Sequence, residues 1–138
     1  MFNIVEPATL VRNALNLMKS VNLSYVVVMD DDMYRGLFTE RDYARNLIMQ
    51  GRTSNTTTVE KVMTIDLPIV TPDTTAEQCM LLMNSHKARY LVVFDDERFV
   101  GVVTIHDLLR EAISNTQTFN QDLAASLVKQ EEENSRIY

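Results

Sequence analysis

An internal repeat constrains the fold of this chain more than any other feature of its sequence. The stretch Gly36–Asp42 reads GLFTERD, and it recurs as GVVTIHD over Gly101–Asp107. The two glycines are 65 positions apart (101 − 36), and the same offset aligns residues 4–45 with residues 69–110 without a gap. Such self-similarity predicts two copies of one supersecondary unit. The identical pairs are Ile4/Ile69, Val5/Val70, Pro7/Pro72, Thr9/Thr74, Leu17/Leu82, Met18/Met83, Ser20/Ser85, Tyr25/Tyr90, Val27/Val92, Val28/Val93, Asp30/Asp95, Asp31/Asp96, Gly36/Gly101, Thr39/Thr104, Asp42/Asp107 and Arg45/Arg110.

Hydrophobic patterning predicts the same order of elements in both copies. A short first strand precedes a helix whose apolar residues fall at i, i+3, i+4 and i+7. Next comes an unbroken apolar run, which is typical of a strand covered on both faces. An acidic turn, a third strand and a second helix follow, so each copy reads β-α-β-β-α and the fold class is α/β. The predicted strands are 2–5, 25–29 and 34–38 in the first copy and 67–70, 90–94 and 99–103 in the second.

The chain divides into three segments on this pattern. Residues 1–58 are the first repeat with its linker, residues 59–113 are the second repeat, and residues 114–138 are a helical tail. A domain of about 60 residues is marginal alone. We therefore expect the two repeats to share one core in a module with a pseudo-two-fold axis. The tail predicts a helix over about 120–130, with Leu123 and Leu127 on its apolar stripe.

Composition excludes several classes of function. The net charge of −6 argues against general binding to nucleic acids or anionic membranes. No apolar run approaches the roughly 20 residues that span a bilayer. The first residues lack the basic start and long apolar core of a signal peptide. The single cysteine, Cys79, excludes an intramolecular disulfide and fits a reducing compartment, so a cytoplasmic protein is expected. Its place in the helical pattern makes Cys79 a core residue rather than a reactive thiol.

The repeated threonine and aspartate have a structural explanation. A threonine at a helix N-cap with an acid three residues later forms a capping box, as expected for Thr39 with Asp42 and for Thr104 with Asp107. Thr9 is the expected N-cap of the first helix. The glycine of each repeat lets its strand approach another backbone closely. None of these roles requires a ligand.

The sequence also resembles a known family. The glycine–two apolar–threonine–x–x–aspartate motif occurs twice, Val62-Met63-Thr64 comes before the first strand of the second repeat, and VTPD stands at 70–73. These features resemble tandem cystathionine β-synthase (CBS) domain pairs of the small stand-alone type. The two repeats differ at two positions of interest. The first repeat has Ser24 where the second repeat has Arg89, and it has Arg41 where the second repeat has His106. Tyr90 stands where the family often has histidine.

The resemblance implies that adenine nucleotides bind in clefts between the repeats as regulatory ligands. AMP or ATP is the expected ligand, with ADP, NADH and S-adenosylmethionine as further candidates. It places Asp42 and Asp107 on the ribose hydroxyls, and the threonine hydroxyls and first helical amides near the phosphate. The implied site residues are Thr39, Arg41, Asp42, Thr104, His106 and Asp107, with Arg89 and Tyr90 at the phosphate end and Ile4, Val26, Ile69 and Leu91 around the adenine.

Each cation has a structural alternative. In this alternative, Arg41 and Arg45 lie on a solvent-exposed helix face, and Arg52 caps the carbonyls of the preceding helix. The acidic turns at 30–32 and 95–97 are expected to be hairpin turns rather than metal sites. No three residues have the spacing of a zinc site, and no resident metal is expected.

Two functions from different classes remain open at this stage. The first is a regulatory module that senses an adenine nucleotide. The second is a ligand-free module that docks on an unidentified partner protein. An enzyme is not expected, because no nucleophile with a base, Walker-type loop or pair of catalytic carboxylates is recognisable. We also expect a homodimer, with an interface around Tyr43, Leu47, Leu108 and Ala112.

Overall fold

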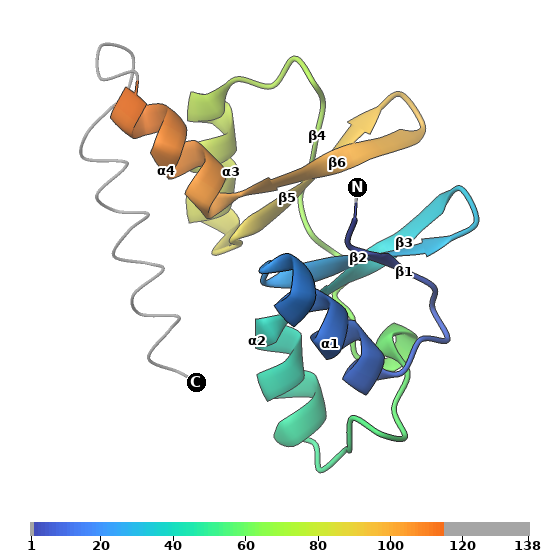
Figure 1. Ribbon diagram of the computed structural model, residues 1–138. Helices are drawn as coiled ribbons and strands as arrows, with labels where there is room; N and C mark the ends of the chain where they lie inside the picture. The colour runs from blue at the N-terminus through green and yellow to red at the C-terminus, as the bar shows by residue number, and fades with distance from the viewer. Residues whose placement is uncertain (1, 115–138) are drawn as a thin grey trace. The chain divides into compact units, whose positions relative to one another are not determined.

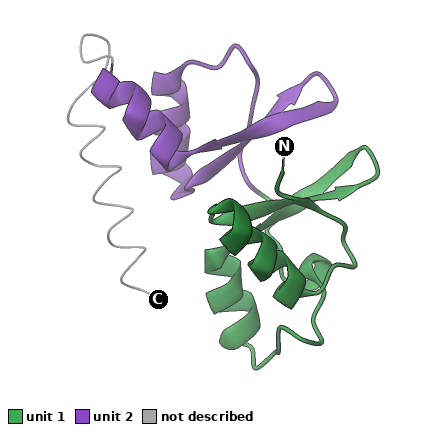
Figure 2. Ribbon diagram, in the orientation of Figure 1, with its two compact units in different colours: residues 1–66 green, residues 67–138 purple. Residues whose placement is uncertain are grey.

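A computed structural model describes residues 2–114 of the chain, and these form two compact units. Among the described residues, unit 1 ends at Asp66 and unit 2 begins at Leu67 (Figure 2). The predicted α/β fold is confirmed, because each unit contains a three-stranded sheet with helices. The sequence predicts a tail over residues 114–138 with a helix over 120–130. From residue 115 onward, this tail lies outside the described residues. None of the helices that the structure describes has the length and apolar character needed to cross a membrane.

Unit 1 follows the predicted order β-α-β-β-α (Figure 1). In its sheet, β1 runs parallel to β2, and β2 forms an antiparallel hairpin with β3. The second helix begins as α2 and widens into the π-helical segment η1, where the amide of Met49 donates to the carbonyl of Ala44, five residues back. The elements are β1 Ile4–Val5, α1 Val11–Val21, β2 Tyr25–Asp30, β3 Met33–Thr39, α2 Glu40–Asp42, η1 Tyr43–Ile48 and the short 3-10 helix η2 Val59–Lys61.

Unit 2 repeats the topology of unit 1 in the same register. Gly36 pairs with Val28 in the first hairpin, and Gly101 pairs with Val93 in the second. Both hairpins turn through two residues, of which Asp31 and Asp96 have left-handed backbones (φ 54° and 56°), as tight hairpins require. The acidic stretches are therefore hairpin turns, as predicted. The elements are β4 Ile69–Val70, α3 Ala76–His86, β5 Tyr90–Asp95, β6 Arg98–Thr104 and α4 Ile105–Ser114.

Each unit has a core cluster of its own. Val11, Ala14 and Met18 of α1 are buried, and Cys79 on α3 is 4 % exposed, so the predicted apolar helix faces are confirmed. Unit 1 extends to Asp66 because Val59 and Val62, which follow the linker, are buried in its cluster. The sequence assigns these residues to the second repeat.

Two of the four residues predicted at the dimer interface are buried within their own units. Leu47 and Leu108 are only 2 % and 5 % exposed, since they pack inside the core clusters of their own units. Tyr43 and Ala112 pack against the same clusters. The apolar face of each second helix is thus already used within the chain.

The prediction that Thr9 is the N-cap of the first helix is wrong. Helix α1 is preceded by Leu10, whose side chain forms no cap. Instead, the amides of Val11 and Arg12 donate to the carbonyls of Thr57 and Ser54 in the linker, over 2.8 and 3.0 Å. The linker satisfies helix donors that a capping side chain would otherwise satisfy. Sequence pattern alone does not reveal a partner more than forty residues away.

Candidate functional site

The repeated motif caps the second helix in both units. In unit 1, the amide of Thr39 donates to Oδ2 of Asp42 over 3.0 Å, and the amide of Asp42 donates to Oγ1 of Thr39 over 3.2 Å. In unit 2, the same two bonds join Thr104 and Asp107 over 2.9 and 3.2 Å. The predicted capping boxes are therefore confirmed.

Further donors surround the aspartate of unit 1. The hydroxyl of Thr39 donates to Oδ2 of Asp42 over 3.2 Å. Oδ1 of Asp42 accepts hydrogen bonds from the hydroxyl of Thr64 over 2.6 Å and from the side-chain amide of Asn46 over 3.3 Å. A carboxylate offers about four acceptor positions, so these bonds occupy all of them. Asp42 is 4 % exposed.

The segment that carries Thr64 is attached to the edge of β3. Leu37 and Thr64 exchange two main-chain hydrogen bonds of 3.0 and 2.8 Å. A Cβ at Gly36 would lie 2.8 Å from the carbonyl oxygen of Thr64, so this approach requires glycine. Asn46 also donates to the carbonyl of Val62 over 2.9 Å. Asp42 and Asn46 thus anchor the segment that leaves unit 1.

Burial raises the pKa of Asp42 above its ordinary value. The hydrogen bonds from Thr64 and Thr39 and the charge of Arg41 lower the pKa and offset only part of this effect. The carboxylate of Asp42 is therefore stabilised by hydrogen bonds from protein groups, while water has little access to it.

The aspartate of unit 2 has different surroundings. The side chain of Asp107 is 42 % exposed. Besides the amide of Thr104, its described partner is the guanidinium of Arg110, whose side chain is 73 % exposed. Position 111, which matches Asn46 in the repeat, is Glu111, and an ionised carboxylate is not a donor. A Cβ at Gly101 would meet no described atom within 4 Å.

The other residues expected at the site fall into two groups. The first group is accessible: Ile69 is 64 % exposed, His106 is exposed, and Arg89 is half-buried. The carbonyl of Arg89 accepts from the amide of Ile105 over 2.9 Å, so Arg89 lies beside the first residue of α4. The structure therefore brings Arg89, Thr104, His106 and Asp107 to one end of unit 2.

The second group is enclosed or belongs to unit 1. Val26 and Leu91 have no exposed surface and belong to the core clusters of their units, while Tyr90 is 8 % exposed. In this conformation none of the three presents a surface to a ligand. Ile4 is 45 % exposed and Arg41 is half-buried.

Sequence reasoning missed the roles of Thr64 and Asn46. Thr64 lies in the Val-Met-Thr stretch that carries the family resemblance, and nothing in that stretch points to Asp42. One signal was available, because the ungapped alignment replaces an amide donor at 46 by an acid at 111. The approach of Thr64 to Asp42, 22 residues away, had no such signal.

The structural alternative for Arg52 is supported. Its guanidinium donates to the carbonyl of Asn46 over 3.1 Å at the end of η1. Residues 2–114 contain no group of three histidine, cysteine or acidic side chains positioned to hold a metal ion.

Comparisons with known proteins agree with the repeat. The CBS domain family matches residues 2–48 and 59–114. Among curated proteins, the chain is 32 % identical to CBS domain-containing protein YhcV of Bacillus subtilis over 111 residues, covering 80 % of this chain and 79 % of that protein. It is 35 % identical over 108 residues to the mitochondrial protein CBSX3 of Arabidopsis thaliana, covering 75 % of this chain and 52 % of that protein. The chain thus spans about half the length of the Arabidopsis protein.

The chain also matches parts of enzymes. The match to inosine-5′-monophosphate dehydrogenase of Methanocaldococcus jannaschii, at 31 % identity, covers 77 % of this chain but only 21 % of that enzyme. The match therefore concerns one part of that enzyme. In YhcV, by contrast, the match takes up most of the protein.

Solved structures give the same fold. A protein with CBS domains from Burkholderia ambifaria superposes with a TM-score of 0.77 at 34 % identity, covering 87 % of each chain. CBSX2, whose structure was solved in complex with AMP, superposes with a TM-score of 0.68 at 26 % identity, covering 83 % of this chain and 90 % of that one. With two matching segments in one chain, this protein belongs to the CBS domain family and carries a tandem pair of its domains.

Proposed function

We propose that this protein is a regulatory module that binds an adenine nucleotide and has no catalytic activity of its own. The observation that carries the proposal is the half-exposed carboxylate of Asp107 at the start of α4, close to the backbone of Arg89. A carboxylate accepts hydrogen bonds from a ribose diol, as the acidic residue of dinucleotide folds does. The AMP complex of the related CBSX2 supports this choice of ligand class.

The phosphate end of the ligand lies, in this proposal, at the start of α4. This helix has ten residues, and its dipole favours an anion at this end. Arg89 and His106 are the basic side chains that the local backbone brings to this end of unit 2. An arginine guanidinium can donate two parallel hydrogen bonds to phosphate. AMP and ATP are therefore preferred over adenosine.

Regulation then follows from linkage. A nucleotide that binds one conformation of the module more tightly than another shifts the population toward it. A partner protein, which the sequence does not identify, binds the selected conformation. The cytoplasmic location expected from the sequence remains a prediction.

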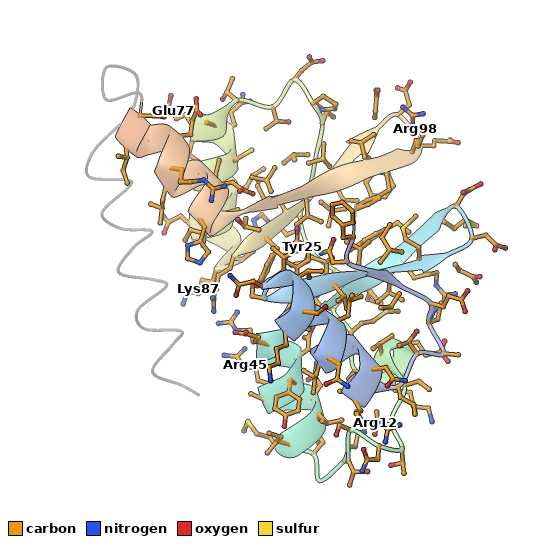
Figure 3. All side chains as sticks on the ribbon, in the orientation of Figure 1. Arg12, Tyr25, Arg45, Glu77, Lys87 and Arg98 are labelled. Atoms are coloured by element: carbon orange, nitrogen blue, oxygen red, sulfur yellow. The ribbon has the colours of Figure 1, made fainter. Side chains whose placement is uncertain are left out.

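A thermal-shift screen with AMP, ADP, ATP, NADH and S-adenosylmethionine tests the proposal. At least one of them should raise the melting temperature, since a ligand that binds only the folded state stabilises it. Arg89→Ala should weaken AMP binding about tenfold and leave adenosine binding unchanged. The matched control is Arg98→Ala, at the far end of β6 from α4 (Figure 3). No shift with any of the five compounds would refute nucleotide sensing.

We also propose that the chain forms a homodimer through helix surfaces other than those first expected. Ile48 and Ile113 occupy matching positions in the repeat and are 56 % and 77 % exposed, and Met49 beside Ile48 is 73 % exposed. Exposed apolar side chains of this size at the ends of two helices favour an interface. The same surfaces suit a module whose main task is docking on a partner, which is the second candidate function.

A further inference from the structure

The two repeated aspartates differ in their capacity to accept a new donor. A ribose presents two neighbouring hydroxyls, and each needs an acceptor position on the carboxylate. All the acceptor positions of Asp42 are taken by Thr39, Thr64 and Asn46, whereas Asp107 accepts from the amide of Thr104 and the exposed Arg110. Of the two aspartates, Asp107 is the one with solvent access, and the described residues leave acceptor positions on its carboxylate unoccupied.

Within unit 1, the chain itself supplies what a ligand would supply. The hydroxyl of Thr64 lies 2.6 Å from Oδ1 of Asp42, which is the contact that a ribose hydroxyl would make. Removing Thr64 from this position would also break its two main-chain bonds with Leu37. A ligand at Asp42 would therefore have to displace the hydroxyl of Thr64, which lies on a segment paired with β3.

We infer that the chain binds one nucleotide through Asp107, and that Thr64 and Asn46 close the equivalent position in the first repeat by occupying Asp42. This inference rests on the proposed function and specifies which repeat performs it. Thr64 and Asn46 act as specificity-determining residues, because they decide how many of the two motifs bind ligand. Asp42 is a structural anchor for the linker.

The sequence difference behind this assignment is small. Residues 46 and 111 occupy the same place on the second helix of each repeat. Asn46 donates to Asp42 and to the carbonyl of Val62 at once. Glu111 is exposed and, when ionised, repels the carboxylate of Asp107 instead of satisfying it. The second site thus remains open to an external donor.

Isothermal calorimetry with AMP and with ATP on the full chain tests the inference, using the wild type, Asp107→Asn and Asp42→Asn. We expect one nucleotide per chain. Asp107→Asn should weaken binding at least about tenfold, because hydrogen bonds to a charged acceptor are lost. Asp42→Asn should change the dissociation constant less than about twofold while lowering the melting temperature.

If Asp42→Asn does not fold, the wild-type stoichiometry and Asp107→Asn decide the question, since Asp107 is half exposed and its replacement leaves the core intact. Thr64→Ala is a second variant on the unit 1 side: it should leave the affinity of the Asp107 site unchanged, and because it frees an acceptor position on Asp42, any second nucleotide per chain should appear in this variant and not in the wild type. Two nucleotides per chain, equal losses in both aspartate variants, or a loss confined to Asp42→Asn would overturn the inference and leave nucleotide sensing standing. No heat with either nucleotide would overturn the inference, and nucleotide sensing falls as well only if none of the five compounds shifts the melting temperature.

Discussion

The hydroxyl of Thr64 donates a 2.6 Å hydrogen bond to the buried carboxylate of Asp42. This bond joins the segment after η2 to the cap of the second helix. Asp42 also accepts hydrogen bonds from the amide and the hydroxyl of Thr39. One carboxylate therefore stabilises a helix start and holds the segment around Thr64 against the edge of β3.

Replacing Thr64 by valine should destabilise the protein. Valine keeps the shape of the side chain but removes the hydroxyl, so a buried charge loses one donor. Hydrogen bonds to charged groups contribute about 1.5–3 kcal/mol to stability, and we expect a loss of that size in the free energy of unfolding measured with urea. Thr71→Val is the matched control, because the hydroxyl of Thr71 is exposed and contacts only Thr74. Equal stability of the two variants would contradict the anchoring role of Asp42.

The two repeated glycines should respond differently to alanine. Gly36→Ala places a Cβ about 2.8 Å from the carbonyl oxygen of Thr64, and that backbone must move. We expect a loss of roughly 1–3 kcal/mol in unfolding free energy, as for other overpacked sites. Gly101→Ala meets no described atom within 4 Å, and should be neutral or slightly stabilising, since alanine lowers the entropy of the unfolded chain. Urea melts of both variants by circular dichroism make the comparison.

Cys79 should react slowly with thiol reagents in the folded protein. The residue is 4 % exposed, and burial raises the pKa of its thiol. Little thiolate is therefore present at neutral pH, and the reaction should accelerate only as the pH rises above the ordinary thiol range. Absorbance assays with a disulfide reagent should show rapid reaction in urea and slow reaction in buffer. A fast reaction under both conditions would place the thiol at the surface.

The proposed homodimer should depend on Ile48 and Ile113. A charged side chain at an apolar interface loses its hydration without gaining a partner, so Ile48→Arg and Ile113→Arg should shift the mass seen by light scattering from dimer to monomer at tens of micromolar. Met33→Arg is the control, because Met33 is 70 % exposed at the hairpin end of β3. A wild-type monomer at this concentration would refute the dimer.

Most of the fold was predictable from local information. Apolar spacing, the paired acidic turns and the capping threonines determine two β-α-β-β-α units, because these signals act within one or two turns of backbone. The helix faces around Ala14 and Met83 and the burial of Cys79 followed from the same periodicity. The repeat also located both aspartates correctly at the starts of their helices.

The tertiary structure makes the two repeated threonine–aspartate motifs different, although they are identical in sequence. Identical threonine–aspartate motifs become a saturated carboxylate in one unit and an open one in the other, because Thr64 approaches Asp42 from 22 residues away. The same kind of distant partner replaced Thr9 as the cap of α1. Leu47 and Leu108 pack in the cores of their own units, against residues of the first helix and of the sheet. The sequence by itself determined which residues form the motif, and only three-dimensional packing decided which carboxylate has acceptor positions left for a ligand.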